Sequence, residues 1–258
     1  MIKLTFIGTS DAFNHGGRGN SCYWVEDEVG TYMVDCGPTA AAVIERGHLS
    51  TEKLDAIFFT HLHGDHIAGI PGILLHFLFK DQRKRDFYII GPKGTEQRLK
   101  ALLDVCYPHL LDKPLPFQIH YLNFELGDDP TLCYEQEFLG RKLTVIHAKH
   151  DPYVNPTSFK VQVLGQSQNI TFSGDTGWHK PLVDLSDQSD VLICECSYDL
   201  PYYDGHLSIE EFKKYRGEIK AKKLYLTHLS QASRDLAVAL KDVYDWEIAD
   251  DLIQIEIN

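Results

Sequence analysis

The sequence predicts a layered α/β fold in a single domain covering residues 1–258, and three observations support this. Strand-like runs alternate along the chain with helix-like stretches, which is typical of α/β layers. No low-complexity tract, short repeat or linker separates them. Candidate ligand residues extend from His61 to His228, so most of the chain must converge on one site.

The expected strands are rich in β-branched and aromatic residues and are bounded by Gly, Pro, Asp or Asn. In chain order they are Lys3–Ile7, Ser21–Glu26, Thr31–Asp35, Asp55–Thr60, Phe87–Ile90, Lys142–His147, Ser158–Leu164, Asn169–Ser173, Asp190–Glu195, Lys223–Thr227 and Leu252–Ile257.

Three expected helices have recognisable starts. Pro71 suits the first helical residue of a helix over Gly72–Gln82, because a missing N–H costs little there. Thr95 can cap a helix over Glu96–Cys106. The clearest start follows Leu207, where Ser208 and Glu211 form a capping box and Leu207 can pack against Phe212.

The run Phe58–His66 carries the strongest chemical signal. An apolar strand leads into His61, and alternation along the strand places His63 on the same side. Gly64 lets the backbone turn so that Asp65 and His66 return to that point. Imidazole nitrogens and carboxylate oxygens are suitable ligands for zinc. A solvated histidine-rich loop is the alternative, but polar groups at the end of a buried strand need partners.

Further ligands are expected where later strands end. Asp175 follows a strand in a glycine turn, and His228 follows an apolar strand and a threonine, as His61 does. Taken alone, Asp175 also suits an Asx turn and His228 a core or capping histidine. Together with the first run they complete two coordination shells.

His147 and His150 compete for one ligand position. Three residues apart on a strand, they would point to opposite faces. We favour His150, because it stands nearer the loop from which the other ligands emerge.

The net charge of −12 argues against a protein that coats nucleic acid, since such binding depends on neutralising phosphates. It leaves room for phosphate capture by bound cations. The chain has no segment that resembles a signal peptide or membrane helix, so we expect a cytoplasmic protein. The six scattered cysteines are expected to be reduced and buried.

The chain resembles the metallo-β-lactamase superfamily over nearly its whole length, and within it the ribonuclease Z-like branch. The motifs that carry this resemblance are Phe6–Ser10, Gly16–Asn20, Asp35–Gly37, the His-x-His-x-Asp-His run, Gly91-Pro92, His150, Ser173–Thr176 and Leu226–Ser230. The resemblance implies an αββα sandwich in which two central mixed sheets are flanked by helices.

The resemblance also implies two metal ions, zinc with manganese or iron as alternatives. It places His61, His63 and His150 on one ion, Asp65, His66 and His228 on the other, and Asp175 between them. It further assigns catalytic assistance to Glu195 and His206, although the sequence around these two differs from the usual pattern of the branch.

The implied activity is that of a metal-dependent phosphodiesterase acting on RNA or a small phosphodiester. Asp65 would orient the nucleophile while binding metal, and His206 would protonate the leaving group or stabilise developing charge. Ribonuclease Z carries a glycine- and proline-bearing arm that grips tRNA, and the segment between Gly91 and Leu143 contains no such arm.

Two other functions share the same ligands. One is hydrolysis of a lactone, thioester or amide, because fold does not determine chemistry. The other is a metal-binding scaffold without activity. No membrane partner is expected, and a homodimer is compatible with the sequence.

Overall fold

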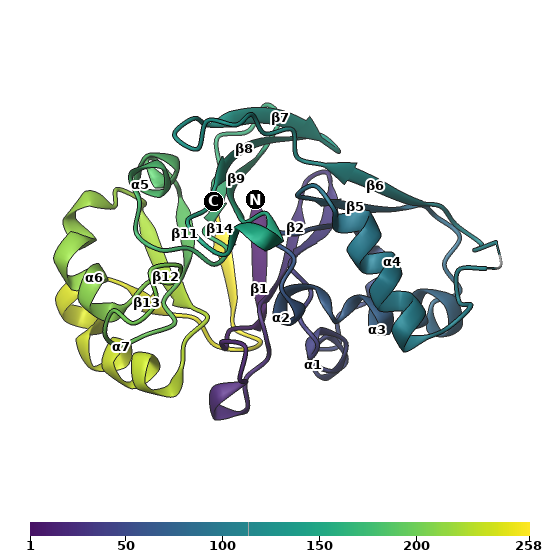
Figure 1. The fold of residues 1–258 in the computed structure, drawn as a ribbon, viewed down its shortest axis with the longest axis horizontal. Coiled ribbons are helices and arrows are strands. Elements are labelled where there is room, and N and C mark those ends of the chain that lie inside the picture. Colours follow the sequence, from purple (N-terminus) through teal and green to yellow (C-terminus); the bar gives the residue numbers. More distant parts are fainter. Residues whose placement is uncertain (113) are drawn as a thin grey trace.

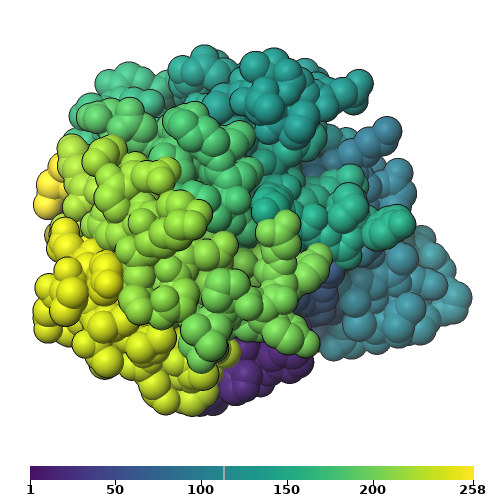
Figure 2. All heavy atoms as spheres, turned by 60° about the vertical axis from the view of Figure 1, so that its left-hand side comes forward, coloured from purple at the N-terminus to yellow at the C-terminus, as the bar shows by residue number. Residues whose placement is uncertain are grey.

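The computed structural model describes residues 1–112 and 114–258 as two seven-stranded sheets that pack face to face between two groups of helices (Figure 1). Helices α1 to α4 lie on one side of the pair of sheets, and α5 to α7 lie on the other. In Figure 2 the C-terminal half, green to yellow, faces the viewer, and part of the N-terminal half, in blue, lies behind it.

The first sheet contains the strands of the N-terminal half and the last strand of the chain. In spatial order they are β14 (Gln254–Ile257), β1 (Ile2–Gly8), β2 (Cys22–Asp27), β3 (Gly30–Val34), β4 (Leu54–Phe58), β5 (Phe87–Gly91) and β6 (Ile119–Asn123). Neighbours from β14 to β3 are antiparallel, and neighbours from β3 to β6 are parallel.

The second sheet repeats this mixed plan. In spatial order its strands are β13 (Glu247–Ile248), β12 (Lys223–Thr227), β11 (Val191–Glu195), β10 (Asn169–Phe172), β9 (Thr157–Val163), β8 (Arg141–His147) and β7 (Tyr134–Phe138). Neighbours from β7 to β10 are antiparallel, and neighbours from β10 to β13 are parallel. The carboxyl ends of β8, β10, β11 and β12 therefore share one edge.

The helices cover the outer faces of the sheets. On the first sheet they are α1 (Ala40–Arg46), α2 (Gly64–Ile67), α3 (Ile70–Leu75) with the π-helix η3 (His76–Lys80), and α4 (Thr95–Cys106). On the second they are α5 (Lys180–Ser186), α6 (Ile209–Tyr215) and α7 (Gln231–Tyr244). Short 3-10 helices are η1 (His15–Gly17), η2 (Thr51–Lys53), η4 (Pro152–Val154) and η5 (Arg216–Glu218). Within the described part of the chain, every helix is too short or too polar to cross a bilayer.

Three apolar layers hold these elements together. The central layer lies between the sheets, where Phe58 of the first sheet meets Phe159 of the second with ring centroids 6.2 Å apart. One outer layer packs the first sheet against helices α1, α3 and α4, and the other packs the second sheet against α5 to α7. This confirms the expected αββα sandwich with two central mixed sheets.

All the predicted strands are present, and each bound agrees within two residues. Three further strands, β6, β7 and β13, were missed. Each lies at the edge of a sheet, where a strand has one neighbour and its side chains are only partly buried. Their weak apolar pattern follows from that position.

The predicted helix starts have mixed outcomes. The capping box of Ser208 and Glu211 is confirmed. Pro71 is the second helical residue rather than the first, and that helix ends at Lys80. Thr95 does not cap α4, because the N-cap is Gly94 with φ +95° and the Thr95 hydroxyl donates to the Pro92 carbonyl. Helices α1, α2, α5 and α7 were not predicted.

All six cysteines are free thiols, as expected. Four of them are buried: Cys22, Cys36, Cys194 and Cys196. The expectation of burial is wrong for Cys106 and Cys133, which are exposed at the end of α4 and just before the edge strand β7.

Candidate metal centre

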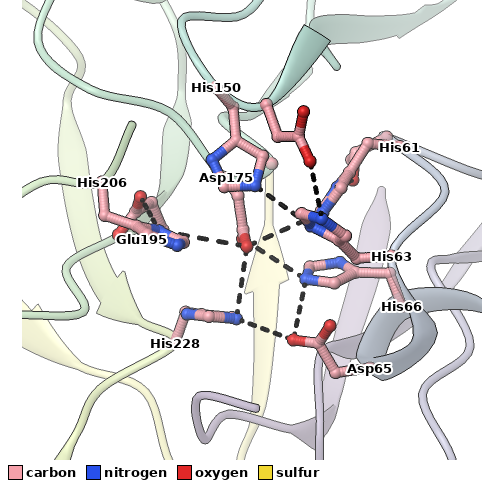
Figure 3. Close-up of polar contacts among 12 residues, drawn as sticks. His61, His63, Asp65, His66, His150, Asp175, Glu195, His206 and His228 are labelled. Atoms are coloured by element: carbon pink, nitrogen blue, oxygen red, sulfur yellow. Dashed lines mark hydrogen bonds and ion pairs between the residues drawn. The ribbon is translucent and has the colours of Figure 1, made fainter. Parts of the chain in front are cut away.

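The side chains that the sequence singled out as ligands point toward one another at one edge of the two sheets (Figure 3). They come from the loop after β4, from α2, and from the loops after β8, β10 and β12. The hydrogen bond from Thr157 N to the Thr60 carbonyl, 2.9 Å long, joins the end of β4 to the second sheet. Residues far apart in sequence thus meet where the two sheets meet.

The loop after β4 differs from the expected strand and glycine turn. The strand ends at Phe58, so His61 and His63 lie in a loop and alternation does not orient them. Gly64 has no positive φ and is the first residue of α2, with open space where a Cβ would lie. The short helix, with His63 as its N-cap, provides the reversal that carries His66 back to His61.

Four ligand atoms form the first group. His63 Nδ1 lies 3.2 Å from His61 Nε2 and 3.1 Å from His150 Nε2. Asp175 Oδ2 lies 3.7 Å from His61 Nε2. Ligand atoms bound tetrahedrally to zinc at about 2.0–2.1 Å lie about 3.3 Å apart. These four atoms are therefore close enough together to bind one metal ion.

The second group contains Asp65, His66, Asp175 and His228, with all four ligand atoms within 4.8 Å of one another. Asp65 Oδ2 lies 3.3 Å from His228 Nε2 and 3.5 Å from His66 Nε2. Asp175 Oδ1 lies 3.3 Å from His66 Nε2. Asp175 belongs to both groups and is the side chain that lies between them.

Gly174 places Asp175 between the two groups. It has φ +56°, and a Cβ there would come within 2.8 Å of both the Thr157 carbonyl oxygen and the Thr60 Cβ. The expected tight turn after β10 is therefore present and requires glycine.

Hydrogen bonds to the opposite ring nitrogens orient the histidines toward a cation. His150 Nδ1 donates to the Gly205 carbonyl over 2.7 Å, so in the neutral ring Nε2 carries the lone pair. Burial lowers the pKa of His61 and of His150 and favours these neutral forms. Lone pairs that face one another across about 3 Å repel unless a cation lies between them. The donor set of the first group therefore suits a metal ion.

His66 shows the same need for positive charge in the second group. Its buried Nε2 has no hydrogen-bond partner and faces the carboxylates of Asp65 and Asp175. Burial lowers the pKa of His66, but these carboxylates, Asp175 first, outweigh it and hold that pKa well above its usual value. A proton or a metal cation can supply the charge, and the ligand types fit zinc.

Sequence reasoning noted Asp35 in a motif but assigned it no role, although it supports both groups. Its carboxylate accepts hydrogen bonds from His66 Nδ1 at 2.8 Å and from the Thr60 hydroxyl at 2.9 Å. The Thr60 oxygen in turn lies 3.0 Å from His61 Nδ1. The signal available in the sequence was an aspartate at the end of an apolar strand. In the structure Asp35 directly follows β3 and has φ +57°. Such partners fix the orientation of metal-binding histidines.

His206 and Glu195 form a pair beside the second group. His206 Nδ1 donates to Glu195 Oε1 over 2.8 Å and lies 4.0 Å from Asp175 Oδ2. Burial lowers the pKa of His206, but Glu195 raises it to about 9. Glu195 is buried and also accepts hydrogen bonds from the backbone N–H groups of Thr176, Ser197 and Leu207. It therefore holds His206 in place and keeps it protonated.

Ser197 is a second residue that the sequence did not reveal. Its hydroxyl donates to Glu195 Oε2 over 3.0 Å and accepts from His228 Nδ1 over 2.9 Å. One oxygen thus connects a candidate ligand with the carboxylate that holds His206.

His147 lies apart from both groups. Its Nε2 is 2.8 Å from the Gly127 carbonyl oxygen, and its ring packs edge-on against Tyr134. The structure therefore brings His150, and not His147, next to His61 and His63.

The chain is similar to known proteins in both sequence and structure. A family model described as Anti-Pycsar protein Apyc1 matches residues 2–243. A ribonuclease Z of Nitrosopumilus maritimus is 28% identical over 309 aligned positions that cover 100% of both chains. The metallo-beta-lactamase fold protein YhfI from Bacillus subtilis aligns with TM-score 0.78, 22% identity and 99% of both chains. The short form of human tRNase Z aligns with TM-score 0.76, 23% identity and 99% of both chains.

Proposed function

The chain belongs to the Anti-Pycsar protein Apyc1 family and is a ribonuclease Z-like member of the metallo-β-lactamase superfamily. We propose that it is a two-metal phosphodiesterase that acts on small phosphodiesters. The observation that carries this proposal is the placement of two ligand groups that share Asp175, next to a histidine paired with a buried glutamate.

The proposal assigns one zinc ion to each ligand group. The first ion would be held by His61, His63, His150 and Asp175, and the second by Asp65, His66, His228 and the same Asp175. Bound cations supply charge compensation for the phosphate and lower the pKa of a water molecule toward neutrality. Manganese or iron would suit the same nitrogen and oxygen ligands.

Three side chains would act around these ligands. His206, held at Nδ1 by Glu195, keeps a proton at Nε2 that it can donate to the leaving oxygen. Glu195 acts through His206 and is a positioning residue. Asp65, with one oxygen directed at His66 and His228, has a second oxygen with which to orient the attacking water.

A small substrate is favoured over RNA. The alignment with the ribonuclease Z relative has 309 positions, whereas this chain has 258 residues, so it lacks residues at about 50 of them. Among the described residues, the segment between β5 and β8 contains α4, β6 and β7 and no projecting glycine- and proline-bearing arm. The net charge of −12 also disfavours a polyanionic substrate.

A substrate panel tests the proposal. We expect hydrolysis of bis-p-nitrophenyl phosphate and little or no cleavage of a precursor tRNA or a lactone. Preferred hydrolysis of the lactone, or of a thioester or amide, would overturn the phosphodiesterase assignment. No hydrolysis with two bound metals would leave a metal-binding scaffold.

We infer that the enzyme forms a homodimer and resides in the cytoplasm. Phe79 and Tyr107 line one groove and are 72% and 39% exposed, a feature typical of contact surfaces. Light scattering after gel filtration should give twice the chain mass, and Phe79→Glu should give the monomer mass. A monomer mass for the unmodified chain would contradict the dimer.

The cysteines support the proposed location in the cytoplasm. All six are free thiols, which suits a reducing compartment.

A further inference from the structure

The loop after β1 contains the segment Gly16–Asn20, which contributes no ligand to the candidate metal centre. Its arginine, Arg18, is only 8% exposed although it carries a charge. A buried guanidinium needs hydrogen-bond acceptors, and Arg18 finds them in two backbone carbonyls. Nη1 donates to the Thr9 carbonyl over 3.2 Å, and Nη2 donates to the Leu229 carbonyl over 3.0 Å. Arg18 therefore binds the residue directly after the candidate ligand His228.

The guanidinium closes a ring of hydrogen bonds between the two sheets. Thr9 follows β1 of the first sheet, and Leu229 follows β12 of the second sheet, one residue beyond His228. Leu229 N donates to the same Thr9 carbonyl over 3.3 Å. The peptide groups on both sides of Leu229 are thus bound, one by Thr9 and the other by Arg18. The main chain that leaves His228 is therefore fixed as long as this ring is closed.

The backbone around Arg18 is held by other side chains. The Arg18 carbonyl accepts a hydrogen bond from Asn14 Nδ2 at 2.9 Å, and the N–H of Gly19 donates to Asp251 Oδ2 over 2.7 Å. Asp251 also accepts a hydrogen bond from the Thr9 hydroxyl at 2.9 Å. One carboxylate thus fastens the chain on both sides of the ring that Arg18 closes, so the guanidinium has a fixed base.

His228 needs this support because of its backbone conformation. It has φ +54°, in the left-handed region that residues other than glycine adopt at an energetic cost. From this backbone Nε2 comes within 3.3 Å of Asp65 Oδ2 and 3.5 Å of Asp175 Oδ2 (Figure 3). Ser197 binds the ring at Nδ1, but that contact does not set the main-chain position from which the ring extends. Loss of the left-handed conformation would therefore move Nε2 away from the two carboxylates.

We propose that Arg18 is a positioning residue for the second metal ion: it holds the backbone of His228 in the conformation that directs Nε2 at the centre, and it thereby sets the affinity of the second ligand group. The first group takes its histidines from other loops, so its ion should not depend on Arg18. This inference rests on the proposed two-metal function and adds to it a residue that touches neither metal nor substrate.

Zinc titration of metal-free protein by calorimetry tests the proposal. Arg18→Met keeps an apolar stem but removes the donors. It should weaken the binding of one ion about 10- to 100-fold, the usual effect of losing an outer partner of a metal ligand, and change the other less than about twofold. Unchanged affinity for both ions would overturn the proposal.

Arg18→Lys tests the need for a forked donor and serves if Arg18→Met does not fold. An ammonium group is a compact charge and does not reproduce the geometry with which a guanidinium bridges two carbonyls. The affinity for the second ion should lie between those of Arg18→Met and the unmodified chain. An affinity in Arg18→Lys equal to that of the unmodified chain would refute the role of the guanidinium bridge.

Two further backgrounds show which ion is affected. In His150→Ala the remaining ion occupies the second group, and adding Arg18→Met should weaken its binding about 10- to 100-fold. In His228→Ala the remaining ion occupies the first group, and the same addition should have no effect, because the residue that Arg18 positions is gone. Equal losses in both backgrounds would contradict a role through His228.

Arg216→Met is the matched control for a general loss of stability. Arg216 also donates to two backbone carbonyls, those of Tyr244 at 2.8 Å and Asp245 at 2.7 Å, at the end of α7. Arg18→Met and Arg216→Met should both lower the melting temperature of the metal-free protein, but only Arg18→Met should weaken zinc binding. Equal weakening by both variants would make Arg18 a general stabiliser of the fold and overturn the proposal.

Activity separates this inference from the proposed function. Hydrolysis of bis-p-nitrophenyl phosphate by Arg18→Met should fall at limiting zinc and recover when zinc is raised about 100-fold, because excess ligand offsets a weaker site. A loss that excess zinc does not restore would contradict a role through metal binding. No hydrolysis by the unmodified chain with two ions bound would overturn the phosphodiesterase function instead, and the zinc affinities of the variants would still decide the role of Arg18.

Discussion

At the scale of single residues, the site depends on which nitrogen of each histidine carries the proton. Gly205, Asp35 and Ser197 each bind the ring nitrogen that faces away from the centre, in His150, His66 and His228 respectively. Such partners set the direction of the remaining nitrogen, and losing one typically costs 10- to 100-fold in metal affinity. These three hydrogen bonds therefore direct the other ring nitrogen of each histidine toward the centre.

His206 gives the most specific prediction about catalysis. His206→Ala should keep its metals and its melting temperature but lose about 10²–10⁴-fold in rate on an alkyl phosphodiester, whose leaving oxygen needs a proton. The loss on a p-nitrophenyl ester should be much smaller, because that group departs as an anion. His120→Ala, at a surface histidine paired with Asp86, is the control. Equal losses on both substrates would contradict acid catalysis.

Metal affinity should depend on pH through His66 and His228. Burial lowers the pKa of each, but Asp175 and its neighbours outweigh burial and raise it, so both rings hold protons that a cation must displace. Raised pKa values mean that protons compete more strongly as the pH falls. Zinc affinity measured by calorimetry from about pH 6 to about pH 8 should rise with pH, with proton release. A pH-independent affinity would contradict this charge arrangement.

The candidate ligands and the preference for His150 could be predicted from the sequence, because most of these residues follow the end of a predicted strand. Their supporting partners were not. Asp35 and Ser197 lie in loops that the sequence does not connect with the histidines they bind, and only the packing of strands places them there. The sequence therefore predicted candidate ligands but not the side chains that orient them.

At the scale of elements, the start of α6 fixes the loop that carries His206. Ser208 accepts a hydrogen bond from Glu211 N, and the Glu211 side chain accepts one from Ser208 N. Leu207 and Phe212 are buried in the same apolar layer. The box thus holds the residue directly after His206.

Ser208→Ala should lower the free energy of unfolding by about 1 kcal/mol, the usual cost of losing an N-cap. For a chain of this size that corresponds to a fall in melting temperature of about 2–4 °C. Ser208→Thr, which keeps the hydroxyl, should recover most of the loss. An unchanged melting temperature in Ser208→Ala would show that the cap contributes nothing.

The sequence revealed elements with strong local signals and missed those that depend on their neighbours. Of the four strands at sheet edges, β14 was predicted, whereas β6, β7 and β13 were missed. The sequence analysis predicted a glycine turn in place of helix α2. The helix has four residues, and Gly64, Asp65 and His66 were interpreted as a turn residue and two metal ligands. Tertiary packing, which local patterns do not contain, determined these elements.

At the scale of the whole molecule, a buried ion pair links the two sheets. Arg141 of β8 donates two hydrogen bonds of 2.7 Å to Asp27 of β2, and both side chains are 1% exposed. Arg141 also lies 4.7 Å above the ring of Tyr32. Together with the central apolar layer, this contact supports our proposal that residues 1–258 form a single domain.

Asp27→Ala should therefore destabilise the whole chain by about 3–5 kcal/mol, because it leaves the Arg141 charge buried without a partner. Calorimetry should show one transition at a lower temperature. Replacing both partners, Asp27→Leu with Arg141→Met, should recover much of the stability. Two separate transitions, in the variant or in the unmodified chain, would contradict the single domain.

The central claim is a pair of metal ions held by residues from both halves of the chain, and metal content tests it most directly. After purification without chelator and incubation with zinc, elemental analysis should give two equivalents per chain, because the donors exceed those that one tetrahedral ion can use. Asp175→Ala, which removes the shared carboxylate, should lower the content of both ions, and His150→Ala should lose one. His147→Ala, three residues from His150 and outside both groups, should keep two. Fewer than one equivalent in the unmodified chain, or an unchanged content in Asp175→Ala, would contradict the account.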